Sequence, residues 1–114
     1  NNNLIVTVKV NGRECPMILD TGADSICFTD KHLAGLGINR PTDASAGFAG
    51  GVGGQRRSYQ FTVDSIKLGS VEKRNVRASV ALESSMDKPL LGASFLKGLI
   101  MTFDPIAKTV KVSQ

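Results

Sequence analysis

The amino-acid sequence predicts a single all-β domain. Its 114 residues are enough for one hydrophobic core and too few for two. Short segments in which apolar and polar residues alternate recur along the chain, separated by turn residues. The 12 glycines favour many turns, and no helical pattern exceeds one or two turns.

A β-hairpin is predicted at the start of the domain. Ile5 to Val10 alternate between apolar and polar residues, and an apolar strand resumes from Cys15 to Leu19. Between them, Asn11-Gly12 is the dipeptide most typical of a two-residue hairpin turn. The second strand therefore ends directly before Asp20.

Three short segments follow. Ile26 to Phe28 predicts a strand, and Thr29 is a suitable cap for a one-turn helix that stops at Gly37. Because Gly47 to Gly54 is rich in glycine, we expect a flexible loop between strands there.

The second half of the chain predicts further strands and one short helix. Alternating apolar residues indicate two strands, at Tyr59, Phe61 and Val63, and at Val76, Ala78, Val80 and Leu82. Helical spacing predicts a short helix through Ala93, Leu96 and Ile100. A second hairpin is predicted from Leu99 to Phe103 and from Thr109 to Ser113, with a turn at Asp104-Pro105.

Charge and composition exclude several classes of function. The net charge is +4, but the basic residues are scattered, and the one tight cluster, Arg56-Arg57, lacks the interleaved aromatics of a nucleic-acid platform. We therefore expect no nucleic-acid partner. No apolar run reaches the roughly 18 to 20 residues that cross a bilayer, so we expect no membrane segment within this chain.

The cysteine, histidine and glycine patterns indicate no metal site, phosphate-binding loop or thiol nucleophile. Cys15 and Cys27 match no metal-site spacing, so we expect no metal or cofactor, and they are either two thiols or one disulfide. The glycine-rich loop lacks the ending of a phosphate-binding loop. A thiol nucleophile at Cys27 with His32 as base would lack an orienting partner, so His32 is interpreted as a surface residue of the short helix.

The segment Leu19-Asp20-Thr21-Gly22-Ala23-Asp24 is the strongest candidate for chemistry. It places a carboxylate directly after an apolar strand, followed by a hydroxyl residue and a glycine. A carboxylate in an apolar site needs hydrogen bonds to stay ionised, and a tight turn permitted by glycine supplies backbone amides. By itself the tripeptide Asp-Thr-Gly also fits an ordinary turn.

Three motifs in order resemble the retropepsins, the single-domain aspartic peptidases first known from retroviruses, and especially their bacterial relatives. These are the Leu-Asp-Thr-Gly-Ala-Asp segment, the glycine-rich run from Gly47 to Gly54, and Leu90-Leu91-Gly92. The resemblance covers nearly the whole chain. It implies one domain, residues 1–114, forming a closed or partly open β-barrel with a flap hairpin at about 43–61, one short C-terminal helix and a homodimeric assembly.

The resemblance also assigns roles. The catalytic residues would be Asp20, Thr21, whose hydroxyl locks two Asp-Thr-Gly loops together, and Gly22. Leu90 and Leu91 would form an apolar strand beside the catalytic loop. The substrate-binding residues would be Ala23, Asp24, Cys27, Ala49, Gly50, Gly51, Val52 and Leu90.

The implied function is endopeptidase activity on a peptide or protein substrate. Only one Asp-Thr-Gly occurs, so the second carboxylate of the pair would come from another copy of the chain. The alternative is a retropepsin-like dimerisation or peptide-binding module with weak or no turnover. Intact Asp20 argues against that alternative, and the departures from the family pattern keep it open.

Three departures stand out. Ala93 replaces an arginine that usually pairs with the residue corresponding to Asp24, so Asp24 needs another partner. The N-terminal strand of retroviral enzymes is missing from a chain that begins at Asn1, which leaves room for a leader or anchor upstream and for a periplasmic or membrane-anchored location. The chain also continues past Phe103, so a C-terminal hairpin at about 99–113 is expected to replace that strand in the dimer.

Overall fold

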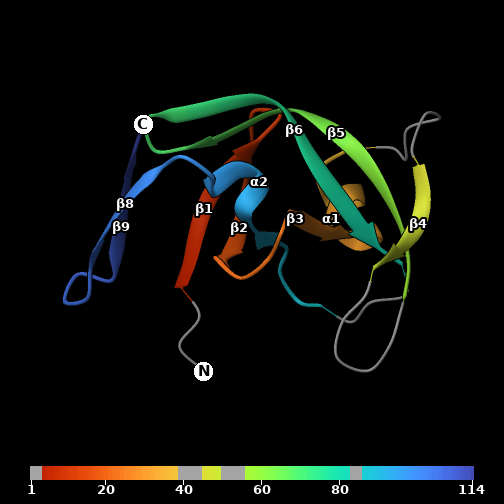
Figure 1. Ribbon diagram of the computed structural model, residues 1–114, viewed down its shortest axis with the longest axis horizontal. Coiled ribbons are helices and arrows are strands. Elements are labelled where there is room, and N and C mark those ends of the chain that lie inside the picture. Colours follow the sequence, from red (N-terminus) through yellow and green to blue (C-terminus); the bar gives the residue numbers. More distant parts are fainter. Residues whose placement is uncertain (1–3, 39–44, 50–55, 83–85) are drawn as a thin grey trace.

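The computed structural model describes residues 4–38, 45–49, 56–82 and 86–114, with backbone alone for 45–49, 56 and 57 (Figure 1). This part of the chain is mostly β and carries two short helices. The elements are β1 (Leu4–Val10), β2 (Arg13–Leu19), β3 (Ile26–Thr29), α1 (Asp30–Gly35), β4 (Ser45–Ala49), β5 (Arg56–Leu68), β6 (Val71–Ala81), β7 (Leu90–Leu91), α2 (Ala93–Leu96), β8 (Ile100–Asp104) and β9 (Thr109–Ser113). The predicted all-β fold is confirmed.

Seven strands form one sheet in the order β1-β2-β7-β3-β6-β5-β4. An additional antiparallel pairing of β1 with β5, at Lys9↔Lys67 and Val10↔Ile66, joins the two sides of the sheet. The sheet therefore curls into a barrel, with β4 on the outer edge of β5. Among the described strands β7 is the shortest, and it lies between β2 and β3.

Alternation along the strands fills the barrel. On β5 the residues Tyr59, Phe61 and Val63 are buried, as their spacing predicted. The ring of Phe61 lies 6.3 Å from those of Phe28 and Tyr59, centroid to centroid, which suits tilted aromatic packing. Aromatic rings from β3 and β5, the two neighbours of β6, therefore pack together in the apolar interior.

The first hairpin forms as predicted. Asn11 and Gly12 have φ angles of 51° and 84°, both in the left-handed region that a tight hairpin turn requires. The turn is attached to β5, because the Asn11 amide donates to the Ser65 carbonyl at 2.9 Å and the Ser65 amide donates to Asn11 Oδ1 at 3.1 Å. A local signal and a long-range contact therefore agree.

Two expectations on local structure are corrected. Residues 45–49 form β4, antiparallel to β5 with Gly47 opposite Ser58, so the first part of the glycine-rich segment is a strand and not a loop. Helix α2 ends at Leu96, because Lys97 leaves the helical region and Gly98 has a φ of 81°. Ile100 belongs to β8, where it is 61% exposed.

Strands β8 and β9 form a separate two-stranded sheet, at the left of Figure 1. The pairs Met101↔Val112 and Phe103↔Val110 place four apolar residues on one face. Val112 is buried, whereas Phe103 is 53% exposed.

None of the helices in the described segments has the length and apolar character that a membrane crossing requires.

Candidate active site

Asp20 lies at the end of β2, where a parallel neighbour fixes its backbone. Strand β7 pairs with β2 in the register Ile18↔Leu90 and Leu19↔Leu91. The Ile18 amide donates to the Pro89 carbonyl at 2.9 Å, and the Asp20 amide donates to the Leu91 carbonyl at 3.1 Å. The loop therefore leaves the sheet at a defined point.

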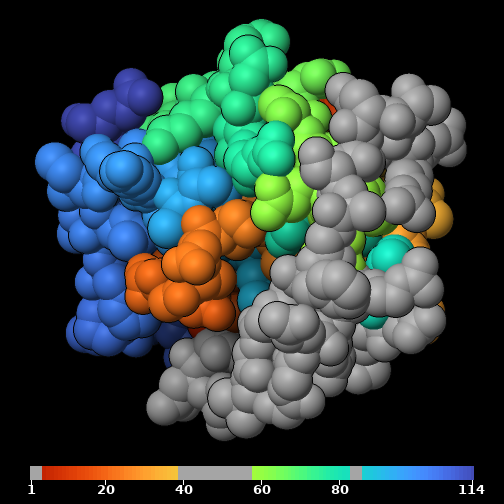
Figure 2. Space-filling view, turned by 45° about the vertical axis from the view of Figure 1, so that its right-hand side comes forward, coloured from red at the N-terminus to blue at the C-terminus, as the bar shows by residue number. Residues whose placement is uncertain are grey.

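The loop itself is a tight turn around the carboxylate. The Gly22 amide donates to Asp20 Oδ1 at 3.0 Å, and the Ala23 amide donates to the Asp20 carbonyl at 3.2 Å. Asp20 is half-buried, while Thr21 and Gly22 are exposed. A carboxylate held by a backbone amide and open to solvent on one side can act on a bound molecule. Figure 2 shows this segment, in orange, at the surface beside the blue C-terminal region.

Gly92 packs directly against the backbone of the Asp20 loop. A Cβ atom at this position would lie 2.3 Å from the Ser25 carbonyl oxygen and 2.7 Å from that of Ala23, closer than carbon and oxygen approach in proteins. The Ala93 amide then donates to the Ala23 carbonyl at 2.8 Å. A glycine is therefore required where the chain passes under the loop.

Two serine hydroxyls that the sequence analysis did not single out anchor the end of the loop. Ser94 Oγ accepts from the Ile26 amide at 3.1 Å and donates to the Arg77 carbonyl at 2.8 Å. Ser79 Oγ lies 3.3 Å from Ser25 Oγ and 3.4 Å from the Ile26 carbonyl. The only local signal for this role was a hydroxyl residue two positions after the Leu-Leu-Gly triplet.

Asp24 forms no ion pair with the residues that the structure describes. In the described segments the ion pairs join Arg74 to Glu72 and Lys88 to Asp87. Asp24 is exposed, and Ala93, which occupies the position expected for an arginine, contributes its backbone amide to the loop. The prediction that Asp24 needs another partner is therefore not met by an ion pair among the described residues.

Cys27 and Leu90 lie side by side. They are directly opposite each other in the antiparallel pairing of β3 with β7, and both are half-buried. Burial raises the pKa of the Cys27 thiol, and hydrogen bonds from Ser79 and the Ala81 backbone partly offset this effect. Cys15 is also a free thiol, buried, with its pKa raised by burial. The alternative of a disulfide is thereby removed.

The predicted flap residues are described only at their edge. Ala49 is the last residue of β4, with Arg56 opposite it on β5. Gly50, Gly51 and Val52 lie outside the described residues. Within the described ranges, no group of three or more histidine, cysteine, aspartate or glutamate side chains is arranged to hold a metal ion.

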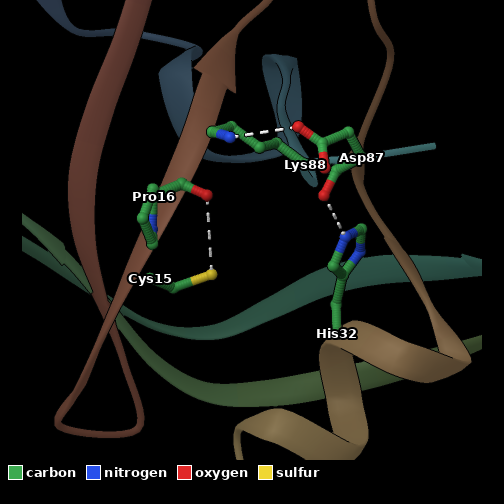
Figure 3. A network of polar contacts seen from close by, with 5 residues as sticks. All are labelled: Cys15, Pro16, His32, Asp87 and Lys88. Atoms are coloured by element: carbon green, nitrogen blue, oxygen red, sulfur yellow. Dashed lines mark hydrogen bonds and ion pairs between the residues drawn. The ribbon is translucent and has the colours of Figure 1, made fainter.

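A cavity of about 350 Å³ lies between β2, α1 and the segment that leads into β7. Its lining comprises Glu14, Cys15, Pro16, Lys31, His32, Gly35, Leu36, Asp87, Lys88 and Pro89. Figure 3 shows His32 reaching across towards Asp87, with Cys15 and Pro16 on β2. His32 thus links helix α1 to the segment before β7, whereas the sequence predicted a plain surface residue.

Comparison with known proteins agrees with this geometry. The profile of the family described as gag-polyprotein putative aspartyl protease matches residues 6–98. An uncharacterized protein from the cobV 5′ region of Sinorhizobium sp. is 31% identical over 104 residues, which cover 89% of this chain and 43% of that protein. The chain therefore spans less than half the length of that relative.

Two solved structures share the fold. A retropepsin-like aspartic protease from Rickettsia conorii superposes with a TM-score of 0.75 at 23% identity, covering 99% of this chain and 92% of that one. The EIAV protease, in complex with the inhibitor HBY-793, gives a TM-score of 0.67 at 26% identity, covering 85% of this chain and 88% of that one. The similarity therefore extends over nearly the whole barrel.

Proposed function

Because this chain belongs to the gag-polyprotein putative aspartyl protease family and has the retropepsin-like fold, we propose that it is an endopeptidase that works as a homodimer with one Asp20 from each subunit. The observation that carries the proposal is the Asp20 turn. Asp20 is half-buried, its carboxylate accepts a hydrogen bond from the Gly22 amide at 3.0 Å, and its backbone is held by β7.

The mechanism follows from placing two such carboxylates together. Like charges a few ångströms apart cannot both ionise, so the pair holds one proton near working pH. The ionised Asp20 takes a proton from water, whose oxygen attacks the peptide carbonyl, while the protonated Asp20 gives its proton to the carbonyl oxygen. Collapse of the tetrahedral species passes a proton to the leaving nitrogen and releases an acid and an amine, with no covalent intermediate.

Cys27 and Leu90 support an apolar substrate pocket. They are paired on neighbouring strands, and β7 joins Leu90 directly to the segment that holds the Asp20 backbone. On this proposal, peptides with apolar residues around the cleaved bond are preferred. Cleavage-site profiling with a diverse peptide pool measures this preference, and a preference for charged residues there would contradict it.

The C-terminal hairpin is proposed as the dimer contact. A lone two-stranded sheet is marginally stable in water, and its unpaired edges favour pairing with another chain. Here the apolar face is only partly covered, since Val112 is buried but Phe103 remains 53% exposed. A second copy would cover this face and bring the two Asp20 loops together.

The proposed catalysis is tested with Asp20→Asn. This variant keeps the shape of the side chain but cannot serve as base, so we expect an unchanged fold and dimer with no peptide cleavage. The wild type should show a bell-shaped dependence of rate on pH, with both limbs belonging to the carboxylate pair. Full turnover by the variant refutes the mechanism. A wild type that binds peptides without cleaving them supports the alternative of a peptide-binding module.

The proposed dimer contact is tested with Phe103→Asp, with Thr102→Asp as the control on the opposite face of the same strand. A charge at Phe103 should disfavour burial of that face, so sedimentation should show a shift towards monomer and a loss of turnover at low concentration. The Thr102 variant should behave as the wild type. Deletion of residues 106–114 should also give a monomer, and a truncated protein that still dimerises and cleaves peptides places the interface elsewhere.

A further inference from the structure

His32 is held by both nitrogens of its ring. The Thr29 amide donates to His32 Nδ1 at 3.0 Å, and Thr29 Oγ1 lies 3.1 Å from the same nitrogen. Because an amide can only donate, Nδ1 accepts, so the proton is on Nε2, which donates to the Asp87 carbonyl at 2.9 Å. The His32 amide in turn donates to Thr29 Oγ1 at 3.4 Å, which completes a capping box at the start of α1.

The Asp87 end of this link leads directly to the candidate active site. Two residues separate Asp87 from Leu90, the first residue of β7. Strand β7 has only two residues, yet the Pro89 and Leu91 carbonyls beside and within it hold the amides of Ile18 and Asp20. A strand this short depends on what fixes its flanks.

The hydrogen bond between His32 and Asp87 lies at the edge of the cavity described above. Both His32 and Asp87 line it, and Figure 3 shows the His32 side chain reaching from α1 to the Asp87 carbonyl. Asp87 directs its carboxylate to Lys88, 3.1 Å away, and it is the Asp87 carbonyl that faces the imidazole. The hydrogen bond from His32 therefore links α1 to the segment before β7 at the edge of the cavity.

We propose that His32 is a positioning residue that holds β7, and with it the wall of the substrate pocket and the Asp20 backbone, to helix α1. The part of this proposal that concerns substrate rests on the proposed peptidase function.

Two substitutions separate capping from bridging. His32→Glu keeps an acceptor for the Thr29 amide, as in a usual capping box, but has no proton to donate to the Asp87 carbonyl. His32→Gln keeps both an acceptor and a donor. Lys31→Gln, which removes a neighbouring charge from the same helical turn, serves as the control.

Amide hydrogen exchange gives the direct readout, because the Ile18 and Asp20 amides both donate to the segment that His32 is proposed to hold. In His32→Glu these two amides should exchange about fivefold faster, the factor that corresponds to about 1 kcal/mol for one hydrogen bond. Exchange at buried Val63 on β5 should stay unchanged. His32→Gln and Lys31→Gln should resemble the wild type. Equal protection of Ile18 and Asp20 in all four proteins overturns the proposal.

Kinetics then connects the link to the substrate. With a peptide substrate, His32→Glu should raise KM several-fold, because the pocket wall at Leu90 is no longer held, and should also lower kcat, because the same strand holds the Asp20 backbone. His32→Gln should leave both close to the wild-type values. An unchanged KM together with faster exchange would overturn the role towards substrate. If the wild type cleaves no peptide, the proposed function fails, and the exchange experiments still decide whether His32 positions β7.

Discussion

Gly92→Ala should disrupt the candidate active site through a single methyl group. The added Cβ would lie 2.3 Å from the Ser25 carbonyl oxygen, whereas such contacts begin near 3.0 Å, so the chain must open by about 0.7 Å, the difference of the two values. Neither side can yield easily, because the Ala93 amide holds the Ala23 carbonyl at 2.8 Å. Overpacking of this kind costs about 3 kcal/mol.

The assay compares thermal unfolding and turnover at one protein concentration. A loss of about 3 kcal/mol lowers the Tm of a domain of this size by roughly 10 to 20 °C. At a temperature where the variant is still folded, peptide turnover should fall about a hundredfold, since displacements near 1 Å in a catalytic loop have effects of that order.

Gly35→Ala is the matched control. A Cβ at Gly35 meets nothing within 4 Å, and this residue lies at the end of helix α1. Alanine favours helix over glycine by up to about 1 kcal/mol, so this variant should be as stable as the wild type or slightly more so. The reasoning is refuted if Gly92→Ala unfolds within about 2 °C of the wild type and retains its turnover.

Three further predictions concern Ser94, the two thiols and Asp24. Ser94→Ala leaves a backbone amide and a carbonyl without their hydroxyl partner and should cost about 1 to 3 kcal/mol in urea unfolding, whereas Ser94→Thr should retain most of the stability and turnover. Because burial raises the pKa of the Cys15 and Cys27 thiols, their alkylation by iodoacetamide at pH 8 should be slower than that of a free thiol and should accelerate in urea. The contribution of the two thiols to the free energy of unfolding is present at neutral pH. It is lost as the pH rises through their raised pKa values in the folded state. Asp24→Asn should change the stability of a monomer by less than about 0.5 kcal/mol, because Asp24 has no ion pair within the described chain, and a larger loss confined to the dimer would indicate a contact from the partner.

Local patterns in the sequence predicted the local elements. The Asn11-Gly12 turn, the Thr29 cap and the alternation of Tyr59, Phe61 and Val63 all occur where they were expected, because each depends on neighbours within a few residues. The same reasoning failed for Ile100, because the helical spacing continues in the sequence past the end of α2 at Leu96 and the positive φ of Gly98. Residue patterns alone also missed the strand at residues 45–49, because this segment, with one glycine at position 47, shows no regular alternation of apolar and polar residues.

For the candidate site, the sequence determined the motif and the tertiary structure determined its supports. Asp20, Thr21 and Gly22 are adjacent, so their turn follows from chemistry within one loop. The insertion of β7 between β2 and β3, the bridge from Ser94 to Ile26 and the link from His32 to Asp87 join residues 55 to 68 positions apart or belong to different strands. No periodicity records such contacts, because a hydroxyl or an imidazole has the same local signature whether it faces solvent or a distant carbonyl, and only the closed barrel brings these groups within hydrogen-bonding distance.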